Sequence, residues 1–313
     1  MTLEPATSSS APGAPRVVVV TGASSGIGLA AALAFAARGD RVVLSARSES
    51  SLRRAEADCR VAGAAGTLIA VADVLDEAAV AAVCDRAVEE FGQVDVWVHA
   101  AAVIAYGRFE DVPSEVFKRV VDTGVHGTVH AARAALAQFR RQDRGTLILV
   151  GSLLGEIATP YMGSYVTGKW AVRGLARVLA VETRRDKDIH VCIVSPGAVN
   201  TPVYAQSATY AGRTGRPPPP VDPPEKVARA IVRCADHPRA RVSVGLANSV
   251  ARLGFTALPW AYDALVGPMM QVFGLSRRAS PPVDGNVAAP VPDGDRLHGT
   301  WSRTGFSRRR RTR

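Results

Sequence analysis

One segment constrains the fold of this chain more than any other: Thr21 to Gly28, which reads Thr-Gly-Ala-Ser-Ser-Gly-Ile-Gly. The β-branched run Val17 to Val20 precedes it and predicts a buried strand, while the alanine-rich stretch 29–38 follows it and predicts a helix that ends at Gly39. Small residues at such a turn let the backbone approach a dinucleotide pyrophosphate, and the helix N-terminus offers free N–H groups and partial positive charge. The alternative is a tight strand-to-helix turn that binds no ligand.

A second pattern combines a phenol, an ammonium and a hydroxyl. Tyr165 and Lys169 are four residues apart, and Ser152 lies upstream of both. Residues four apart on a helix lie on one face, so the ammonium would favour phenolate and lower the pKa of the phenol from about 10 toward neutrality. A nearby hydroxyl could hold a substrate oxygen while the phenol gives or takes a proton. The pattern therefore indicates Ser152, Tyr165 and Lys169 as catalytic, although Tyr-x-x-x-Lys alone also arises on solvated helix faces.

Together the motifs resemble those of the classical short-chain dehydrogenase/reductase family over about residues 16–245. The family's Thr-Gly-x-x-x-Gly-x-Gly matches 21–28, its active-site serine matches Ser152, and its Tyr-x-x-x-Lys matches Tyr165 to Lys169. Its Pro-Gly-x-x-x-Thr turn matches 196–201. The resemblance implies an NAD(P)-dependent oxidoreductase (EC 1.1.1.-) that interconverts a carbonyl and a secondary alcohol by a Tyr-Lys-Ser mechanism.

Strand-like and helical runs alternate along the 313 residues, of which 47% are hydrophobic. This order predicts an α/β fold: a Rossmann-like, doubly wound parallel sheet of about seven strands, with helices on both faces and a helical C-terminal extension. The candidate strands are 17–20, 42–44, 68–71, 94–98, 146–150, 189–194 and 242–244, and the two longest candidate helices are 115–141 and 161–185. The family pairs these two long helices, which implies a homodimer or homotetramer.

Cofactor binding is expected along the carboxyl ends of the strands. The motif matches place the binding residues at Gly22, Ser24, Ser25, Gly26, Ile27, Gly28, Asp73, Val74, Ala100, Ala101, Tyr165, Lys169, Pro196, Gly197, Val199 and Thr201. Asp73 has an alternative interpretation as a helix N-cap.

The end of the second strand bears on cofactor choice. The run Leu44-Ser45-Ala46-Arg47 has no acid to bind the ribose 2′-OH of NAD. The guanidinium of Arg47 suits a 2′-phosphate, because it offers charge-assisted paired hydrogen bonds. We therefore expect NADP(H), with NAD(H) as the second choice and a solvated loop charge as the alternative interpretation of Arg47.

Two departures from the family pattern bear on proton transfer. His99-Ala100-Ala101-Ala102 stands where the family has Asn-Asn-Ala-Gly, and Gly124 stands where it has the Asn that helps to hold a water near the lysine. His99 or His126 could substitute, since imidazole titrates near neutral pH, but both could equally be structural side chains. The departures keep a second function open, that of a catalytically weak NADP(H)-binding sensor or interaction protein.

Four segments are expected: a flexible leader (1–15), the dinucleotide-binding catalytic domain (16–246), an apolar helical extension (247–277), and a disordered linker with an Arg-rich tail (278–313). The stretch 253–275 contains Asp263 and two prolines, which argue against a transmembrane helix. A substrate cap, an oligomer contact and an in-plane membrane anchor remain open for it. A cap or an anchor fits a lipophilic substrate.

Charge and cysteine placement bear on partners and location. Much of the net charge of +10 comes from six arginines in the last thirteen residues, and no recognition motif for nucleic acid accompanies them, so we expect no specific nucleic-acid partner. Four scattered cysteines form no C-x-x-C pair and no His/Cys cluster has metal-ligand spacing, so we expect buried thiols and no metal site. Cytoplasmic location is expected, with peripheral membrane association as the open alternative.

Overall fold

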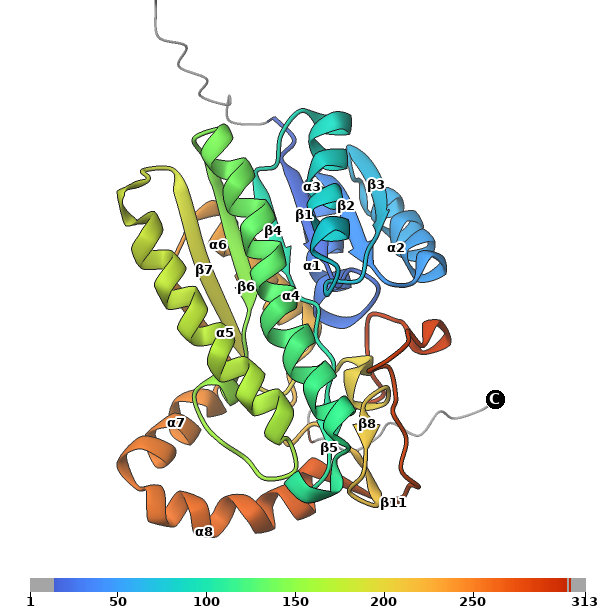
Figure 1. The fold of residues 1–313 in the computed structure, drawn as a ribbon, viewed down its shortest axis with the longest axis vertical. Helices are drawn as coiled ribbons and strands as arrows, with labels where there is room; N and C mark the ends of the chain where they lie inside the picture. Colours follow the sequence, from blue (N-terminus) through green and yellow to red (C-terminus); the bar gives the residue numbers. More distant parts are fainter. Residues whose placement is uncertain (1–13, 303, 305–313) are drawn as a thin grey trace, which may run out of the picture.

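The computed structural model describes residues 14–302 and 304, and its centre is one seven-stranded parallel sheet (Figure 1). The strand order is β3-β2-β1-β4-β6-β7-β10. The strands are β1 (Val17–Thr21), β2 (Arg41–Ala46), β3 (Gly66–Val71), β4 (Val96–His99), β6 (Gly145–Val150), β7 (Ile189–Pro196) and β10 (Arg241–Val244). The order reverses on either side of β1, as in a doubly wound sheet, so the predicted Rossmann-like fold is confirmed.

Helices cover both faces of this sheet. In Figure 1, α3, α4 and α5 lie in front of it, and α1 and α6 lie behind. The helices are α1 (Gly26–Ala36), α2 (Glu49–Ala62), α3 (Glu77–Phe91), α4 (Ser114–Arg141), α5 (Gly163–Glu182) and α6 (Pro224–Asp236). Alternate residues of β1 enter opposite cores, with Val18 and Val20 packed beside α1 and Val17 and Val19 on the other face. Burial on both faces explains why β1 is a continuous apolar run.

The two long helices lie close to their predicted positions. α4 begins one residue before the expected start and ends at Arg141 as expected. α5 begins at Gly163 instead of Tyr161, because Tyr161 has a φ of +69°, which a right-handed helix cannot contain. A 3₁₀ turn, Thr183–Arg185, completes the predicted range. The four cysteines are buried, as expected.

The apolar extension contains two helices at the carboxyl end of the sheet, α7 (Ala247–Ala257) and α8 (Pro259–Met269). A π-helical turn, Met270–Gly274, leads into β11 (Leu275–Ala279), which pairs with β9 (Arg213–Gly215). A second small sheet joins β5 (Ala105–Tyr106) to β8 (Ala208–Thr209). Short 3₁₀ turns lie at Phe109–Asp111, Leu153–Gly155, Pro202–Tyr204 and Pro292–Gly294. Among the residues that the structure describes, no helix has both the length and the apolarity needed to cross a bilayer.

Residues 278–302 differ from the sequence expectation of a disordered linker. This segment runs back along the body toward α1, and Figure 1 shows it in red below the carboxyl ends of β1 and β2. Val287 is 2% exposed and packs into a cluster with Val103 and Ala208, and Leu297 packs on the core beside α1. Residues 1–13 of the leader, and the arginines at 303, 308–311 and 313 of the tail, lie outside the described residues.

Candidate active site

All residues expected to bind cofactor or act in catalysis line one cavity of about 370 Å³ at the carboxyl end of the sheet. The set comprises Gly22, Ser24, Ser25, Gly26, Ile27, Gly28, Arg47, Asp73, Val74, Ala100, Ala101, Ser152, Tyr165, Lys169, Pro196, Gly197, Val199 and Thr201. They come from seven separate stretches of the chain. The parallel sheet brings them together because the carboxyl ends of its strands share one edge.

The glycine loop forms one end of the cavity. Gly22 has a φ of +86°, and a Cβ there would lie 2.6 Å from the main-chain nitrogen of Ala101, so only glycine fits between β1 and the segment after β4. The main-chain nitrogen of Gly22 donates to the oxygen of Ser45 at 2.8 Å. α1 starts directly after Ser25, whose side chain makes no cap hydrogen bond. The main-chain nitrogen of Gly26 at this helix end donates to the oxygen of Arg296 at 3.0 Å. The partial positive charge of the helix end also suits a dinucleotide pyrophosphate, which fits the cradle.

The side chains expected at the adenosine end are held by polar contacts. Asp73 accepts from the main-chain nitrogen of Leu75 at 3.0 Å, and its other oxygen lies 2.6 Å from a guanidinium nitrogen of Arg119. Arg47 follows β2 and donates to the main-chain oxygen of Asn286 at 2.6 Å. A side chain suited to phosphate thus already contacts the C-terminal segment, which the sequence did not predict.

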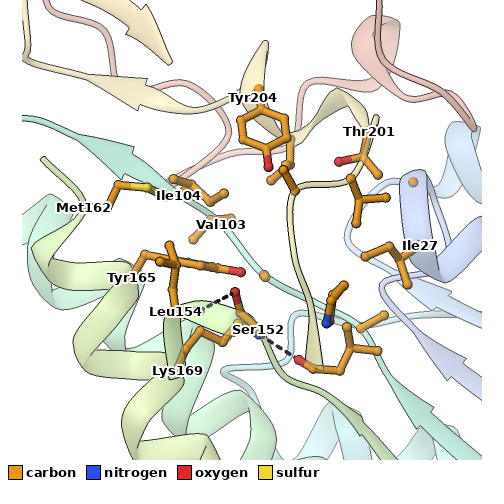
Figure 2. A pocket seen from close by; sticks show the side chains of 18 of the residues that line it. Ile27, Val103, Ile104, Ser152, Leu154, Met162, Tyr165, Lys169, Thr201 and Tyr204 are labelled. Carbon is orange, nitrogen blue, oxygen red and sulfur yellow. Dashed lines mark hydrogen bonds between the residues drawn. The ribbon is translucent and has the colours of Figure 1, made fainter. Parts of the chain in front are cut away.

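The three catalytic candidates lie side by side at the other end of the cavity (Figure 2). Tyr165 and Lys169 stand one turn apart on α5, and Ser152 follows β6. The Nζ of Lys169 donates to the main-chain oxygen of Val150 at 2.8 Å and lies 5.6 Å from the centre of the Tyr165 ring. The Oγ of Ser152 accepts from the main-chain nitrogen of Leu154 at 3.1 Å, so its own proton remains available to another acceptor. Figure 2 shows the hydroxyls of Tyr165 and Ser152 directed into the same space.

Burial dominates the acid–base properties of this trio. It raises the pKa of Tyr165 to about 12, with the hydrogen bond to Ser152 acting in the opposite direction, and it lowers the pKa of Lys169 to about 8. The sequence predicted that Lys169 would make Tyr165 more acidic. In this structure desolvation raises the pKa of the phenol instead, with the hydrogen bond to Ser152 as the opposing influence, while the ammonium of Lys169 donates to the oxygen of Val150.

The two histidines considered for proton transfer have structural surroundings. His99 is 3% exposed, and its Nδ1 lies 2.8 Å from the Oγ1 of Thr21. Burial, together with the charge of Lys169, lowers the pKa of His99 to about 3. His126 is exposed and contacts Asp122, with 3.1 Å between Nδ1 and the carboxylate. Neither histidine is among the described residues that line the cavity, so neither is placed to replace the family asparagine.

Gly124, at that asparagine position, lies where α4 and α5 approach closely. A Cβ at Gly124 would lie 3.8 Å from the Cα of Gly168. Glycines at both positions let the two helix backbones come near each other beside Lys169. The distance of 3.8 Å is an ordinary van der Waals contact, so position 124 has room for a β-carbon.

An apolar chamber extends from Tyr165 away from the glycine loop. Figure 2 shows Tyr204, Ile104 and Met162 around it. Helices α7 and α8 contribute Asn248, Ala251, Tyr262, Val266 and Met269 to the cavity lining. This placement favours a substrate cap among the three uses considered for the extension.

Sequence reasoning missed several lining residues, among them Ile104, Tyr106, Met162 and Asn248. Asn248 is buried and donates to the main-chain oxygens of Ser195 and Val244 at 3.3 and 3.1 Å. A buried amide with main-chain partners leaves no pattern in the sequence. Tyr106 lies within a short apolar run whose only signal was its position just after the fourth strand.

This fold and this site define an oxidoreductase class, in which a Rossmann-like domain joins a dinucleotide cradle to a tyrosine–lysine–serine group. A family model described as short chain dehydrogenase matches residues 16–210. The chain belongs to the short-chain dehydrogenase/reductase family.

Individual relatives agree with this assignment. An uncharacterised oxidoreductase from Bacillus subtilis, YxnA, is 32% identical over 94% of this chain and 83% of its own length. A Mycobacterium paratuberculosis short chain dehydrogenase bound to NAD is 26% identical, with a TM-score of 0.64 over 73% of this chain and 96% of that one. A Thermococcus sibiricus alcohol dehydrogenase complexed with 5-hydroxy-NADP is 29% identical, with a TM-score of 0.63 over 74% of this chain and 95% of that one.

Proposed function

We propose that this protein is an NADP(H)-dependent oxidoreductase that interconverts a carbonyl and a secondary alcohol on a lipophilic small molecule. One observation carries the proposal: the hydroxyls of Tyr165 and Ser152 face a single cavity that joins the glycine cradle to an apolar chamber. A ligand in that chamber would have its reacting oxygen within reach of two hydroxyl groups, on the same side as the dinucleotide site.

The three side chains divide the work as follows. Ser152 accepts from Leu154, which orients its hydroxyl so that its proton can hold a substrate oxygen. Tyr165 is the proton donor when a carbonyl is reduced, and burial keeps its phenol protonated at neutral pH. Lys169, fixed on the oxygen of Val150, positions its charge beside the phenol as negative charge develops there. A bound nicotinamide supplies or accepts the hydride.

Arg47 supports a preference for NADP(H) over NAD(H). It lines the cavity just after β2, where Ser45 and Ala46 leave no carboxylate to bind a ribose 2′-OH. A guanidinium there can pair with a 2′-phosphate. The relative with a bound NADP derivative is consistent with this choice, and the relative bound to NAD keeps NAD(H) as the second candidate.

The chamber supports a lipophilic substrate. Its lining is largely aliphatic and sulfur-containing, with Ile104, Leu154, Met162, Val203, Val266 and Met270 among the wall residues. Apolar walls with a few convergent polar groups are typical of sites for apolar ligands. A long-chain, steroid-like or polycyclic carbonyl compound fits this chemistry.

Two observations favour a second candidate function, a sensor or interaction protein that binds NADP(H) and turns it over weakly. The pKa of Tyr165 is raised to about 12, and Gly124 stands at the family's asparagine position. Both would slow proton transfer to and from the phenol. Tight cofactor binding without turnover of any carbonyl would favour this candidate.

We further propose a homodimer or homotetramer formed through α4 and α5. Trp170, Val178 and Val181 are large apolar residues of α5 that are exposed in the single chain, as expected for a face covered by another copy. Light scattering after size-exclusion chromatography tests this, and a monomer at micromolar concentration would contradict it.

For location, we propose the cytoplasm, with peripheral contact to a lipid surface through the exposed apolar side chains of α7 and α8, such as Leu253, Trp260 and Leu265. Sedimentation with lipid vesicles tests the contact. Protein that stays in the supernatant at every vesicle composition would contradict it.

A direct test of the activity uses the purified protein with NADPH and ketones and aldehydes of increasing apolar size. We expect NADPH oxidation that improves with the apolar area of the substrate, and loss of it in Tyr165→Phe. NADPH fluorescence titration measures binding separately. Failure of the wild-type protein to bind either dinucleotide would contradict the proposal.

A further inference from the structure

The structure encloses the dinucleotide half of the cavity with its own C-terminal segment. We call residues 283–301 the strap. Asn286, Pro290, Val291 and Asp295 of the strap line the same cavity as the glycine loop and Arg47. The family model ends at residue 210, so the strap lies outside the part of the chain that it describes.

The strap contacts both sides of the cofactor cradle through its main chain. The oxygens of Asn286, Val287 and Ala288 accept from Arg47 at 2.6, 3.3 and 3.4 Å. The oxygen of Arg296 accepts from the main-chain nitrogen of Gly26, the first residue of α1, at 3.0 Å. The strap thus engages the groups placed to meet a 2′-phosphate and a pyrophosphate.

Gln206 lies in the loop that follows the Pro-Gly-x-x-x-Thr turn (196–201), and it is hydrogen bonded to the strap. Its side-chain nitrogen donates to the oxygen of Val291 at 3.1 Å and to Asp295 at 3.0 Å, and its main-chain oxygen accepts from the nitrogen of Asn286 at 2.8 Å. At the far end of the strap, the nitrogen of Gly299 donates to the oxygen of Asn200 at 3.1 Å. The strap is therefore fastened at both ends, with the cavity beneath it.

Two glycines show how closely the strap fits. Gly285 has a φ of +56°, and a Cβ there would lie 2.2 Å from the main-chain oxygen of Gln206. At Gly294 a Cβ would lie 2.6 Å from the side-chain nitrogen of Gln206. A larger residue at Gly285 would meet main chain and force the strap away from the body, whereas one at Gly294 would displace the side chain of Gln206.

We propose that the strap covers the bound dinucleotide, held by Gln206 and Asn200 once the cofactor phosphates replace its contacts with Arg47 and Gly26, and that it must open each time the cofactor enters or leaves. The contacts that fasten it are hydrogen bonds from the side chains of Arg47, Arg54 and Gln206, several main-chain hydrogen bonds, and a contact of 2.6 Å between His298 and Glu225. These contacts can break without unfolding the sheet. The inference rests on the proposed dinucleotide site and adds a gate to it. A closed strap slows both association and dissociation, since either step has to wait for it to open.

The test compares Gly285→Ala with Gly39→Ala in the full-length protein by stopped-flow fluorescence with NADPH. Gly39 also has a positive φ, +77°, but a Cβ there would meet nothing within 4 Å, so it reproduces the backbone strain without the clash. Loss of one or two strap hydrogen bonds should raise both rate constants by roughly tenfold or more in Gly285→Ala, with a smaller change in Kd. Gly39→Ala should keep the wild-type rates.

Other outcomes overturn the inference in distinguishable ways. Equal rates in wild type and Gly285→Ala would show that the strap is a fixed wall. A tighter Kd in Gly285→Ala with an unchanged dissociation rate would show that the strap competes with the cofactor. Absence of NADPH and NADH binding in the wild type would refute the proposed function, and the gate with it.

A measurement on the wild-type protein covers the case in which Gly285→Ala does not fold. Hydrogen exchange of the strap amides is followed with and without NADPH. Exchange should slow across the strap when NADPH is present, because the ligand holds it closed, while exchange at the exposed surface of α3 stays the same. Unchanged strap exchange at saturating NADPH would overturn the inference.

Discussion

The buried ammonium of Lys169 donates to the main-chain oxygen of Val150 at 2.8 Å, directly beneath the phenol of Tyr165. Val150 is the last residue of β6, and Lys169 is on α5, so this bond joins the end of the sheet to the catalytic helix. It holds the amine in place, but it does not offset the burial that lowers the pKa of Lys169 to about 8. The site therefore keeps a charged side chain at a cost in stability.

Lys169 should give the protein a pH-dependent stability. The folded pKa of about 8 lies below the ordinary value of 10.5, so between these pH values the folded protein releases a proton that the unfolded chain retains. Stability should therefore rise with pH across this window, by about 1.4 kcal/mol per pH unit from this group. Urea unfolding from pH 7 to 10 gives the free energy of unfolding of wild type and of Lys169→Met. The difference between these two free energies should change with pH by the amount stated. A difference that stays constant would show that Lys169 is not desolvated.

Replacing Tyr165 with phenylalanine should remove turnover while leaving the cavity intact. The ring is partly buried and packs on neighbouring apolar side chains, and phenylalanine keeps this packing but has no proton to give. Loss of a positioned general acid costs ~10² to 10⁴ in kcat. Steady-state kinetics give the loss, and NADPH titration should show nearly unchanged binding. Turnover within a few-fold of wild type would assign the acid role to another group.

Arg47→Gln should reduce the use of NADPH far more than that of NADH. A charge-assisted hydrogen bond contributes about 1.5–3 kcal/mol, so kcat/KM for NADPH should fall by roughly ten- to a hundredfold. NADH lacks the 2′-phosphate and serves as the internal reference.

Arg54→Gln is a matched control for Arg47→Gln, because Arg54 also contacts the strap, donating to the oxygen of Pro292 at 2.8 Å, but is not among the cavity-lining residues. It should leave the ratio of the two cofactors unchanged. Equal losses with NADPH and NADH in Arg47→Gln would mean that Arg47 only fastens the strap.

The sheet and the catalytic motifs could be predicted from local sequence. Strands such as β1 and β6 are buried on both faces, so they appear as short apolar runs between turns. The glycine loop can be recognised in the sequence because Gly22 has a positive φ and lies close to the main chain of Ala101. Both conditions require glycine at this position. Four-residue spacing on a helix was enough to place Tyr165 and Lys169 on one face.

The strap could not be predicted in this way. It is rich in proline, glycine and aspartate, which is typical of linkers, and most of its contacts use main-chain oxygens that leave no side-chain pattern. Its partners, Arg47 and Gln206, are far away in sequence. The raised pKa of Tyr165 could not be predicted from the sequence either, because desolvation depends on which residues the fold packs around the phenol.

His99 should act on stability instead of catalysis. Burial lowers its pKa to about 3, so its folded form stays neutral while the unfolded chain takes up a proton below the ordinary value of 6.5. As pH falls from 6.5, this histidine should cost the folded state about 1.4 kcal/mol per pH unit. His99→Asn, which restores the family residue, should therefore lose less stability than wild type between pH 7 and 5, measured by urea unfolding at each pH.

The same variant also tests the idea of a histidine relay. His99 contacts Thr21 and is not among the cavity-lining residues, so His99→Asn should leave the pH profile of kcat unchanged in shape. A shift of the acidic limb in His99→Asn, with the stability difference absent, would mean that the imidazole exchanges protons with Lys169 during turnover. The free energies of unfolding of wild type and His99→Asn could instead change with pH in parallel, with an unshifted pH profile of kcat. That result would show that His99 is protonated as easily in the folded protein as in the unfolded chain, in spite of its burial.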